Sequence, residues 1–154
     1  MATIKLRGAD ELGFIVINKI VKVRKRTGDE SQVWIYLVGG EIIEEIHKDD
    51  SVVEKRMTEL KDALGNYIEL WSEDGEESPG FLSPAHIVSI RGLIEKRTRH
   101  DEISIYQVLV RLPNEEVIEE EHSDARSVKR RIEEFKRVVE KYATAVPNLT
   151  FEDE

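Results

Sequence analysis

Alternation of apolar and polar side chains predicts a hairpin in the first half of the chain. Residues 33–38 alternate with a period of two and are rich in β-branched and aromatic side chains, which is typical of a half-buried strand. The glycine pair at 39–40 predicts a tight turn, and residues 41–47 then return as a second strand. Residues 14–24 predict a further long strand with a bend near Asn18.

Two later segments repeat an apolar residue every three or four positions, which predicts helices with one apolar face each. The first stripe consists of Val53, Met57, Leu60 and Leu64, and the second of Val128, Ile132, Phe135, Val139 and Tyr142. Asp49 and Asp124 are suited to cap the helix starts, and Gly65 is suited to end the first helix.

The two halves of the chain resemble each other in sequence. When residues 33–64 are aligned with residues 108–139, twelve positions are identical, including Glu45/Glu120, His47/His122 and Arg56/Arg131. Upstream the offset falls from 75 to 67, and Phe14 then aligns with Phe81. The offset thus changes by eight, which places an eight-residue insertion in the second half, within residues 92–102. Identities that run through strand and helix at one register predict an internal duplication.

The duplication predicts an α+β fold. Each unit is expected to form four antiparallel strands and one C-terminal helix, in the order ββββα, with one four-stranded sheet per unit. We expect unit one at residues 1–65, unit two at 66–146 and an acidic tail at 147–154. Units of about 65 residues bury little surface alone, so we expect the two to pack together with pseudo-two-fold symmetry. The sequence leaves open whether they share one core or only abut.

The amino-acid composition limits the classes of function that the chain can have. The chain has 154 residues, of which 36% are charged, and a net charge of −9, which predicts a small soluble protein that disfavours general nucleic-acid binding. The absence of cysteine excludes disulfides and cysteine-bound metal centres. No run is long and apolar enough for a membrane span, and residues 1–7 lack the apolar core of a secretory signal. We therefore expect no membrane partner.

The histidines and acidic runs offer weak candidates for catalysis. His47 and His122 occupy matching positions, which would suit a paired metal or proton-transfer site. Zinc requires three or four ligands at a recognisable spacing, and these are missing, so histidines packed at strand ends are the better interpretation. Consecutive glutamates in residues 44–45 and 119–121 point to opposite faces of a strand and do not make a catalytic pair. No phosphate-binding loop or nucleophile motif is present, and the sequence predicts neither an enzyme nor a cofactor nor a metal site.

Basic residues near two predicted hairpin tips are the candidate contact residues. The six candidates are Arg24, Lys25, Arg26, Lys96, Arg97 and Arg99. They could hold phosphate, dock on an acidic protein or serve only solubility. Trp34 and Tyr36 share one face of their strand, but the second half has Leu109 and Arg111 there, so no repeated stacking platform is expected.

The segments Ile4-Lys5-Leu6, 14–18 and 33–43 resemble the short flagellar FlbD-type proteins and similar small phage-encoded proteins. The pattern is an apolar strand, an F-x-I-N strand, a hairpin and a helix. The resemblance implies a small sheet-plus-helix module with an accessory role, and it transfers no catalytic residue.

Our leading hypothesis is a non-enzymatic structural or protein-interaction module, a component of a phage, a virion or another large assembly. Other proteins of that assembly would be its partners, in a virion or the cytoplasm. The alternative is a regulatory nucleic-acid binder that uses the basic hairpin tips. A third hypothesis is an enzyme whose site surrounds His47 and His122.

Overall fold

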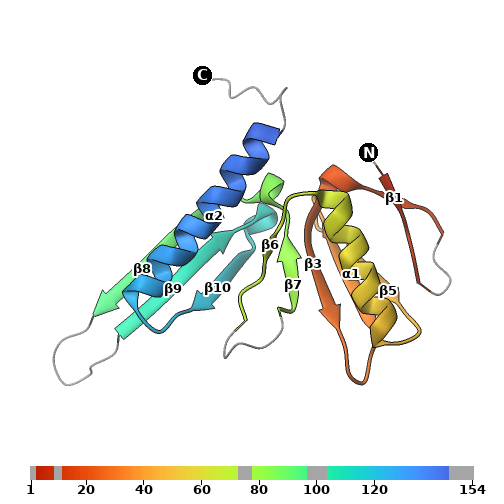
Figure 1. Cartoon of the computed structure of the whole chain (residues 1–154), viewed down its shortest axis with the longest axis horizontal. Helices are drawn as coiled ribbons and strands as arrows, with labels where there is room; N and C mark the ends of the chain where they lie inside the picture. Colours follow the sequence, from red (N-terminus) through yellow and green to blue (C-terminus); the bar gives the residue numbers. More distant parts are fainter. Residues whose placement is uncertain (1–2, 9–11, 73–77, 97–103, 146–154) are drawn as a thin grey trace.

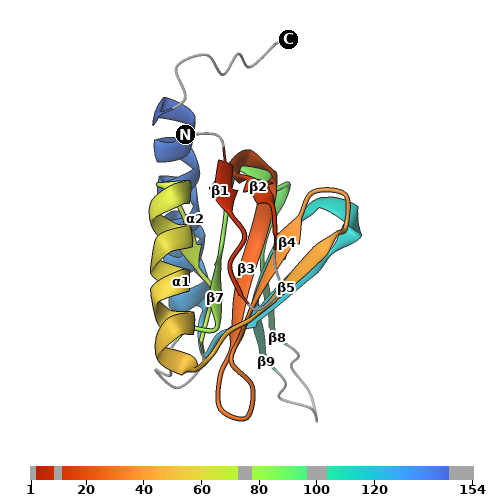
Figure 2. The same cartoon turned by 90° about the vertical axis from the view of Figure 1, so that its right-hand side faces the viewer.

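The fold is α+β, with antiparallel sheets and two helices on one side of them (Figures 1 and 2). The structure is a computed structural model that describes residues 3–8, 12–72, 78–96 and 104–145. The strands are β1 (Thr3–Lys5), β2 (Phe14–Val16), β3 (Ile20–Arg26), β4 (Gln32–Leu37), β5 (Ile42–Ile46), β6 (Ile68–Glu69), β7 (Gly80–Leu82), β8 (Ser89–Lys96), β9 (Ser104–Arg111) and β10 (Val117–Glu121). The helices are α1 (Asp50–Leu64) and α2 (Ala125–Ala145), and the 3-10 turns are η1 (Ile17–Lys19), η3 (Pro84–His86) and η4 (Pro113–Glu115).

The strands form three unequal sheets, which corrects the expectation of one four-stranded sheet per unit. Strands β1 and β2 pair alone, β8, β9 and β10 form a three-stranded sheet, and the order β5-β4-β3-β7-β6 forms a five-stranded sheet. The difference arises because each predicted long strand is interrupted. The turn η1 separates β2 from β3, and η3, which begins at Pro84, separates β7 from β8.

Strand β7 crosses from the second half of the chain into the sheet of the first half. It pairs antiparallel with β3, so that Val23 lies opposite Phe81. Two backbone hydrogen bonds flank the pair: Ser83 N–H donates to Val21 C=O at 3.0 Å, and Lys25 N–H donates to Pro79 C=O at 2.9 Å. The two halves are therefore joined by a continuous hydrogen-bonded sheet.

Two hydrophobic clusters form the core, and each takes residues from both halves of the chain. The first core combines α1 and strands β2 to β4 with Phe81 from β7. The second core combines α2 and strands β6 to β9 with Val21 from β3. This exchange of buried side chains fixes one half against the other.

Strand pairing follows the same register in both halves. Residue Lys5 lies opposite Phe14, and Glu69 lies opposite Phe81. The second hairpins match as well, with Val33 opposite Glu45 and Val108 opposite Glu120. The β8–β9 pair extends farther toward its tip than β3–β4, where the sequence alignment requires an insertion.

The helix ends follow the predicted signals. The side chain of Asp49 accepts a hydrogen bond from Val52 N–H at 3.1 Å, and that of Asp124 accepts one from Ser127 N–H at 2.7 Å. After α1, Gly65 adopts a φ of +78°, a conformation that favours glycine. In the described part of the chain, neither helix has the length and apolar composition needed to cross a membrane.

Candidate interaction surfaces

A buried polar cluster joins α1 to the strands of the first half. Arg56 donates from Nε to Glu45 Oε1 at 2.8 Å and from Nη2 to Glu45 Oε2 at 2.7 Å. Nη2 also donates to the backbone carbonyl of Lys5 at 2.9 Å. His47 Nε2 lies 3.1 Å from Glu45 Oε1. The cluster therefore links β5, α1 and β1 through one fully buried carboxylate.

The second half holds the same cluster. Arg131 donates from Nη2 to Glu120 Oε2 at 2.9 Å and to the backbone carbonyl of Glu69 at 2.8 Å. His122 Nε2 lies 3.3 Å from Glu120 Oε1, and its ring stacks on Trp71 with centroids 4.3 Å apart. The residues involved are the identical pairs of the sequence alignment, and Lys5 and Glu69 occupy matching positions in β1 and β6.

The geometry of these clusters supports a structural role. Among the described residues, every buried side-chain nitrogen or oxygen has a hydrogen-bond partner. The two histidines lie in separate clusters, each against its own glutamate, so the geometry does not bring them together as a pair. Within the same residues, no group of three potential ligands is placed to hold a metal ion.

Electrostatic interactions within the clusters favour the charged forms of Arg131 and Glu59. Burial alone would lower the pKa of Arg131, but the hydrogen bonds and negative charge of Glu120 outweigh it and raise that pKa. Burial likewise tends to raise the pKa of Glu59, and the hydrogen bond and charge of Arg56 reverse the effect and lower it. Arg131 is thus held as a cation between the carboxylates of Glu120 and Glu134.

The basic residues near the β3–β4 tip are engaged within the chain. Lys25 Nζ donates to Glu54 at 2.8 Å, and Arg26 pairs with Glu30 at 3.3 Å while its guanidinium lies 4.5 Å from the centre of the Trp34 ring. Arg24 lines a groove at the junction of the halves. The second basic segment begins at Lys96, the last residue of β8, and its other candidates, Arg97 and Arg99, lie outside the described residues.

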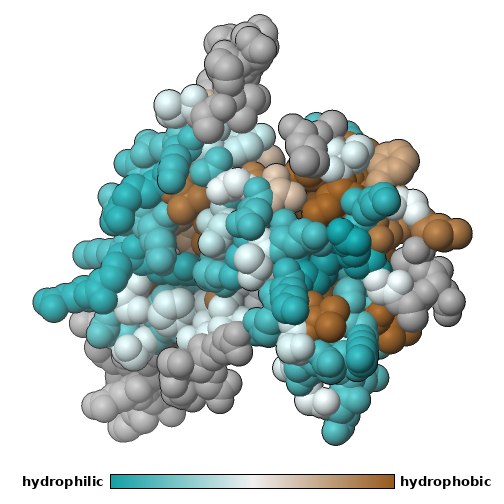
Figure 3. All heavy atoms as spheres, turned by 45° about the vertical axis from the view of Figure 1, so that its right-hand side comes forward, coloured by the Kyte–Doolittle hydropathy of each residue, from teal (hydrophilic) through white to brown (hydrophobic). Residues whose placement is uncertain are grey.

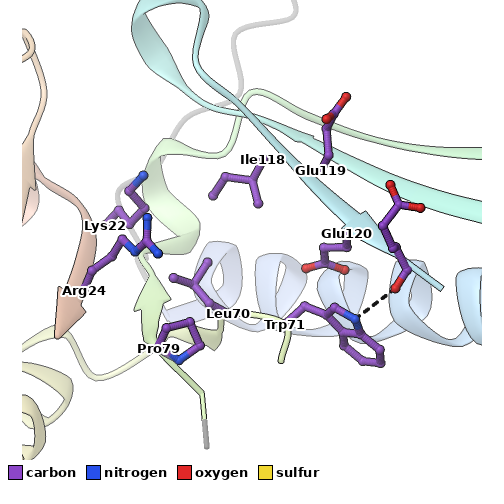
Figure 4. Close-up of a pocket in the computed structure, with 9 residues that line it drawn as sticks. Lys22, Arg24, Leu70, Trp71, Pro79, Ile118, Glu119 and Glu120 are labelled. Carbon is purple, nitrogen blue, oxygen red and sulfur yellow. Dashed lines mark hydrogen bonds between the residues drawn. The ribbon is translucent and has the colours of Figure 1, made fainter. Parts of the chain in front are cut away.

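The groove that Arg24 lines runs between β3 and β10 (Figure 4). Its lining residues are Lys22, Arg24, Leu70, Trp71, Pro79, Ile118, Glu119, Glu120 and Glu121. Basic side chains from β3 thus face acidic side chains from β10, and Lys22 forms an ion pair with Glu116 nearby. The cavity is about 220 Å³, below the size of typical small-molecule sites. We interpret it as part of the junction between the halves.

Several strands lie at sheet edges in the described structure, and two of them, β8 and β2, lie at opposite ends of the molecule (Figures 1 and 2). Strand β8 is one of the two outer strands of the three-stranded sheet, with β10 as the other, and β2 pairs only with β1. Both regions expose large apolar side chains: Phe14 is 64% exposed and Val88, just before β8, is 62% exposed. Apolar surface also gathers at the N-terminal end in Figure 3. Unprotected edges of this kind are common sites of strand addition.

Sequence reasoning named residues at the basic tips, but it did not identify which strands would form these edges. Phe14 and Phe81 are aligned phenylalanines with nothing local to distinguish them, yet Phe81 is fully buried and Phe14 is not. The available signal was the alignment of the two halves, which makes Phe14 the counterpart of Phe81. The buried Glu–Arg clusters were likewise visible only as identical alignment positions.

Comparisons with protein-family models, with curated proteins and with solved structures found no match for this chain.

Proposed function

We propose that this chain is a non-enzymatic structural or protein-interaction module of a larger assembly. The observation that carries the proposal is that two of the sheet-edge strands, β2 and β8, lie at opposite ends of the molecule beside exposed apolar side chains. Monomeric proteins usually shield such edges with charge, proline or a covering element. An open strand edge at each end of the molecule suits a chain whose ends are covered by neighbouring proteins.

The polar clusters support a structural role. The residues that a catalytic site would need, His47 and His122 with their glutamates, are engaged in hydrogen bonds that connect helix to sheet. A phage or virion particle is the assembly that the resemblance to small phage-encoded proteins suggests.

Duplication is part of the proposal. The units would be residues 1–65 and 66–146, and the acidic tail 147–154 lies outside the described structure. Matching strand registers, matching Glu–Arg–His clusters and matching helix caps support it. The junction joins unlike surfaces, the β3 edge of one unit and β7 of the other, so we propose a head-to-tail relation between the units in place of the expected two-fold.

A nucleic-acid role is the second candidate, favoured by the basic residues that end β3 and β8. The ion pairs of Lys25 and Arg26 weigh against it, because a phosphate would have to displace Glu54 and Glu30. Binding through these residues should weaken steeply as salt rises.

The test is capture of partners from the native source on immobilised full-length protein, with and without nuclease and at raised salt. A V88K/F14K variant serves as the matched bait, since both side chains are exposed and their replacement should leave the fold intact. The proposal expects protein partners that survive nuclease and salt and are lost with the variant. Partners that disappear with nuclease and ignore the variant would favour the nucleic-acid role instead.

A further inference from the structure

We infer that copies of this chain join head to tail by strand addition, with β2 of one copy pairing along the free edge of β8 in the next. The inference rests on the proposed function and names a second copy as a partner. Its template is the junction inside the chain, where β7 pairs with β3. Strands β2 and β7 occupy matching positions in the two halves, as do β3 and β8.

The accepting edge is present and unoccupied by any described strand. The residues of β3 that pair with β7 are Lys22, Val23 and Arg24, and their counterparts are Ser89, Ile90 and Arg91. On its other side β8 pairs with β9 just as β3 pairs with β4, with Val23 opposite Ile35 and Ile90 opposite Val110. Because the register is the same, the backbone groups that β3 turns toward β7 have counterparts on the open side of β8.

Apolar residues beside the accepting edge of β8 are more exposed than their counterparts beside β3, as expected if a covering strand is missing there. Val21 is 4% exposed within the second core, whereas its counterpart Val88 is 62% exposed. Val23 and Met57, which share the first core with Phe81, are buried, whereas their counterparts Ile90 and Ile132 are only half-buried. An added strand would cover this surface.

The donating strand shows the complementary difference. Phe81 projects from β7 into the first core and is fully buried, whereas Phe14 projects from β2 and is largely exposed. The residue before each phenylalanine is glycine. At Gly80 an added Cβ would lie 2.0 Å from the backbone oxygen of Val23, so close approach of the strands requires glycine there. Gly13 occupies the matching position just before β2, where, among the described residues, an added Cβ would meet only Leu6 within 4 Å in the single chain.

The template gives the register of the contact. Phe14 of one copy would lie opposite Ile90 of the next, with its ring against the second core. Val16 N–H would donate to Val88 C=O, as Ser83 N–H donates to Val21 C=O inside the chain. Gly92 N–H would donate to Leu12 C=O, as Lys25 N–H donates to Pro79 C=O. Arg91 and Glu44 of the added copy would line one groove, as Arg24 and Glu119 do inside the chain. The two edges lie at opposite ends, so the contact is heterologous and builds a ring or an open array.

The test uses the full chain and two variants that each disable one end, V88K and F14K. Sedimentation or light scattering should show that the wild-type mass rises with concentration above the 17.8 kDa of one chain. Each variant alone should remain a single chain, with association weakened at least about a hundredfold, because a buried lysine would face the apolar core. A 1:1 mixture should form a two-chain species, since each variant retains the end that the other lacks.

The matched control is I94K. Ile94 lies on β8, is 43% exposed and falls two residues beyond Gly92, the last position with a counterpart at the internal junction. It should associate as the wild type does, and circular dichroism should show all variants folded. The inference is wrong if the wild type stays a single chain up to about 1 mM, if I94K is as damaging as V88K, or if the mixture does not pair. A single-chain wild type that still captures V88K-sensitive partners would leave the proposed function standing.

Discussion

The two halves of this molecule have matching elements and registers, yet the same strand position is buried in one half and open in the other. Strand β3 is flanked by β4 on one side and β7 on the other, whereas β8 pairs with β9 on one side and has no described strand on the other. Val21 and Phe81 are buried at that junction, whereas Val88 and Phe14 face solvent. Burial of these residues therefore depends on contacts with the other half of the chain and not only on the half to which they belong.

The polar clusters show the opposite behaviour, because they are alike in both halves. Each lies within one half, between a strand, a helix and a backbone carbonyl of the first strand of that half. Contacts made within one half are alike in the two halves, whereas contacts made at the junction between the halves differ. This contrast can be tested one variant at a time.

Removal of one arginine should have the largest effect. Arg56→Met leaves the buried Glu45 without its cation, and Arg131→Met does the same to Glu120. Breaking a buried pair on one side costs about 3–5 kcal/mol. Denaturant unfolding should give a similar loss in free energy for both variants, because the clusters match.

The double variant E45L/R56M is the control for that prediction. Replacing both partners removes the unpaired buried carboxylate, so the double variant should recover much of the stability that R56M loses. A double variant as unstable as the single one would show that the cluster acts through packing and not through charge.

The next largest effect should separate the two aligned phenylalanines. Phe81→Ala removes a fully buried ring and should cost about 3–5 kcal/mol. Phe14→Ala removes a largely exposed ring and should change the stability of the single chain by less than about 0.5 kcal/mol. Unfolding at low protein concentration checks both values. Equal losses would mean that Phe14 is buried in solution.

Much of the fold was predictable from the sequence because its signals are local. Apolar stripes gave both helices, alternation gave the hairpins, and Asp49 and Gly65 marked the ends of α1. Sheet membership was not predictable, since the pairing of β7 with β3 depends on contacts between residues almost 60 positions apart. The expected four-stranded sheets were wrong for that reason, and the strands that form the exposed edges could not be assigned.

The helix caps should give a smaller effect that is equal in the two halves. Asp49→Ala and Asp124→Ala each remove a carboxylate that accepts a backbone N–H in the first turn. Loss of such a cap costs about 1 kcal/mol. Denaturant midpoints of the two variants should fall by similar amounts, with Asn substitutions as conservative controls that retain most of the stability. A loss confined to one variant would show that the two helix starts are not equivalent in energy.

The smallest effect should come from Glu59, and it should depend on pH. Its pKa is lowered in the folded chain by Arg56, so its contribution is present above the unfolded pKa of about 4.3 and is lost as pH falls through the folded value. The side chain is 40% exposed, and a solvent-screened pair of this kind contributes about 0.2–1 kcal/mol. Glu59→Gln should therefore reduce the free energy of unfolding at pH 7 by that amount and by less at pH 3. A loss of equal size at both pH values would assign the role of Glu59 to packing against Arg56 and not to its charge.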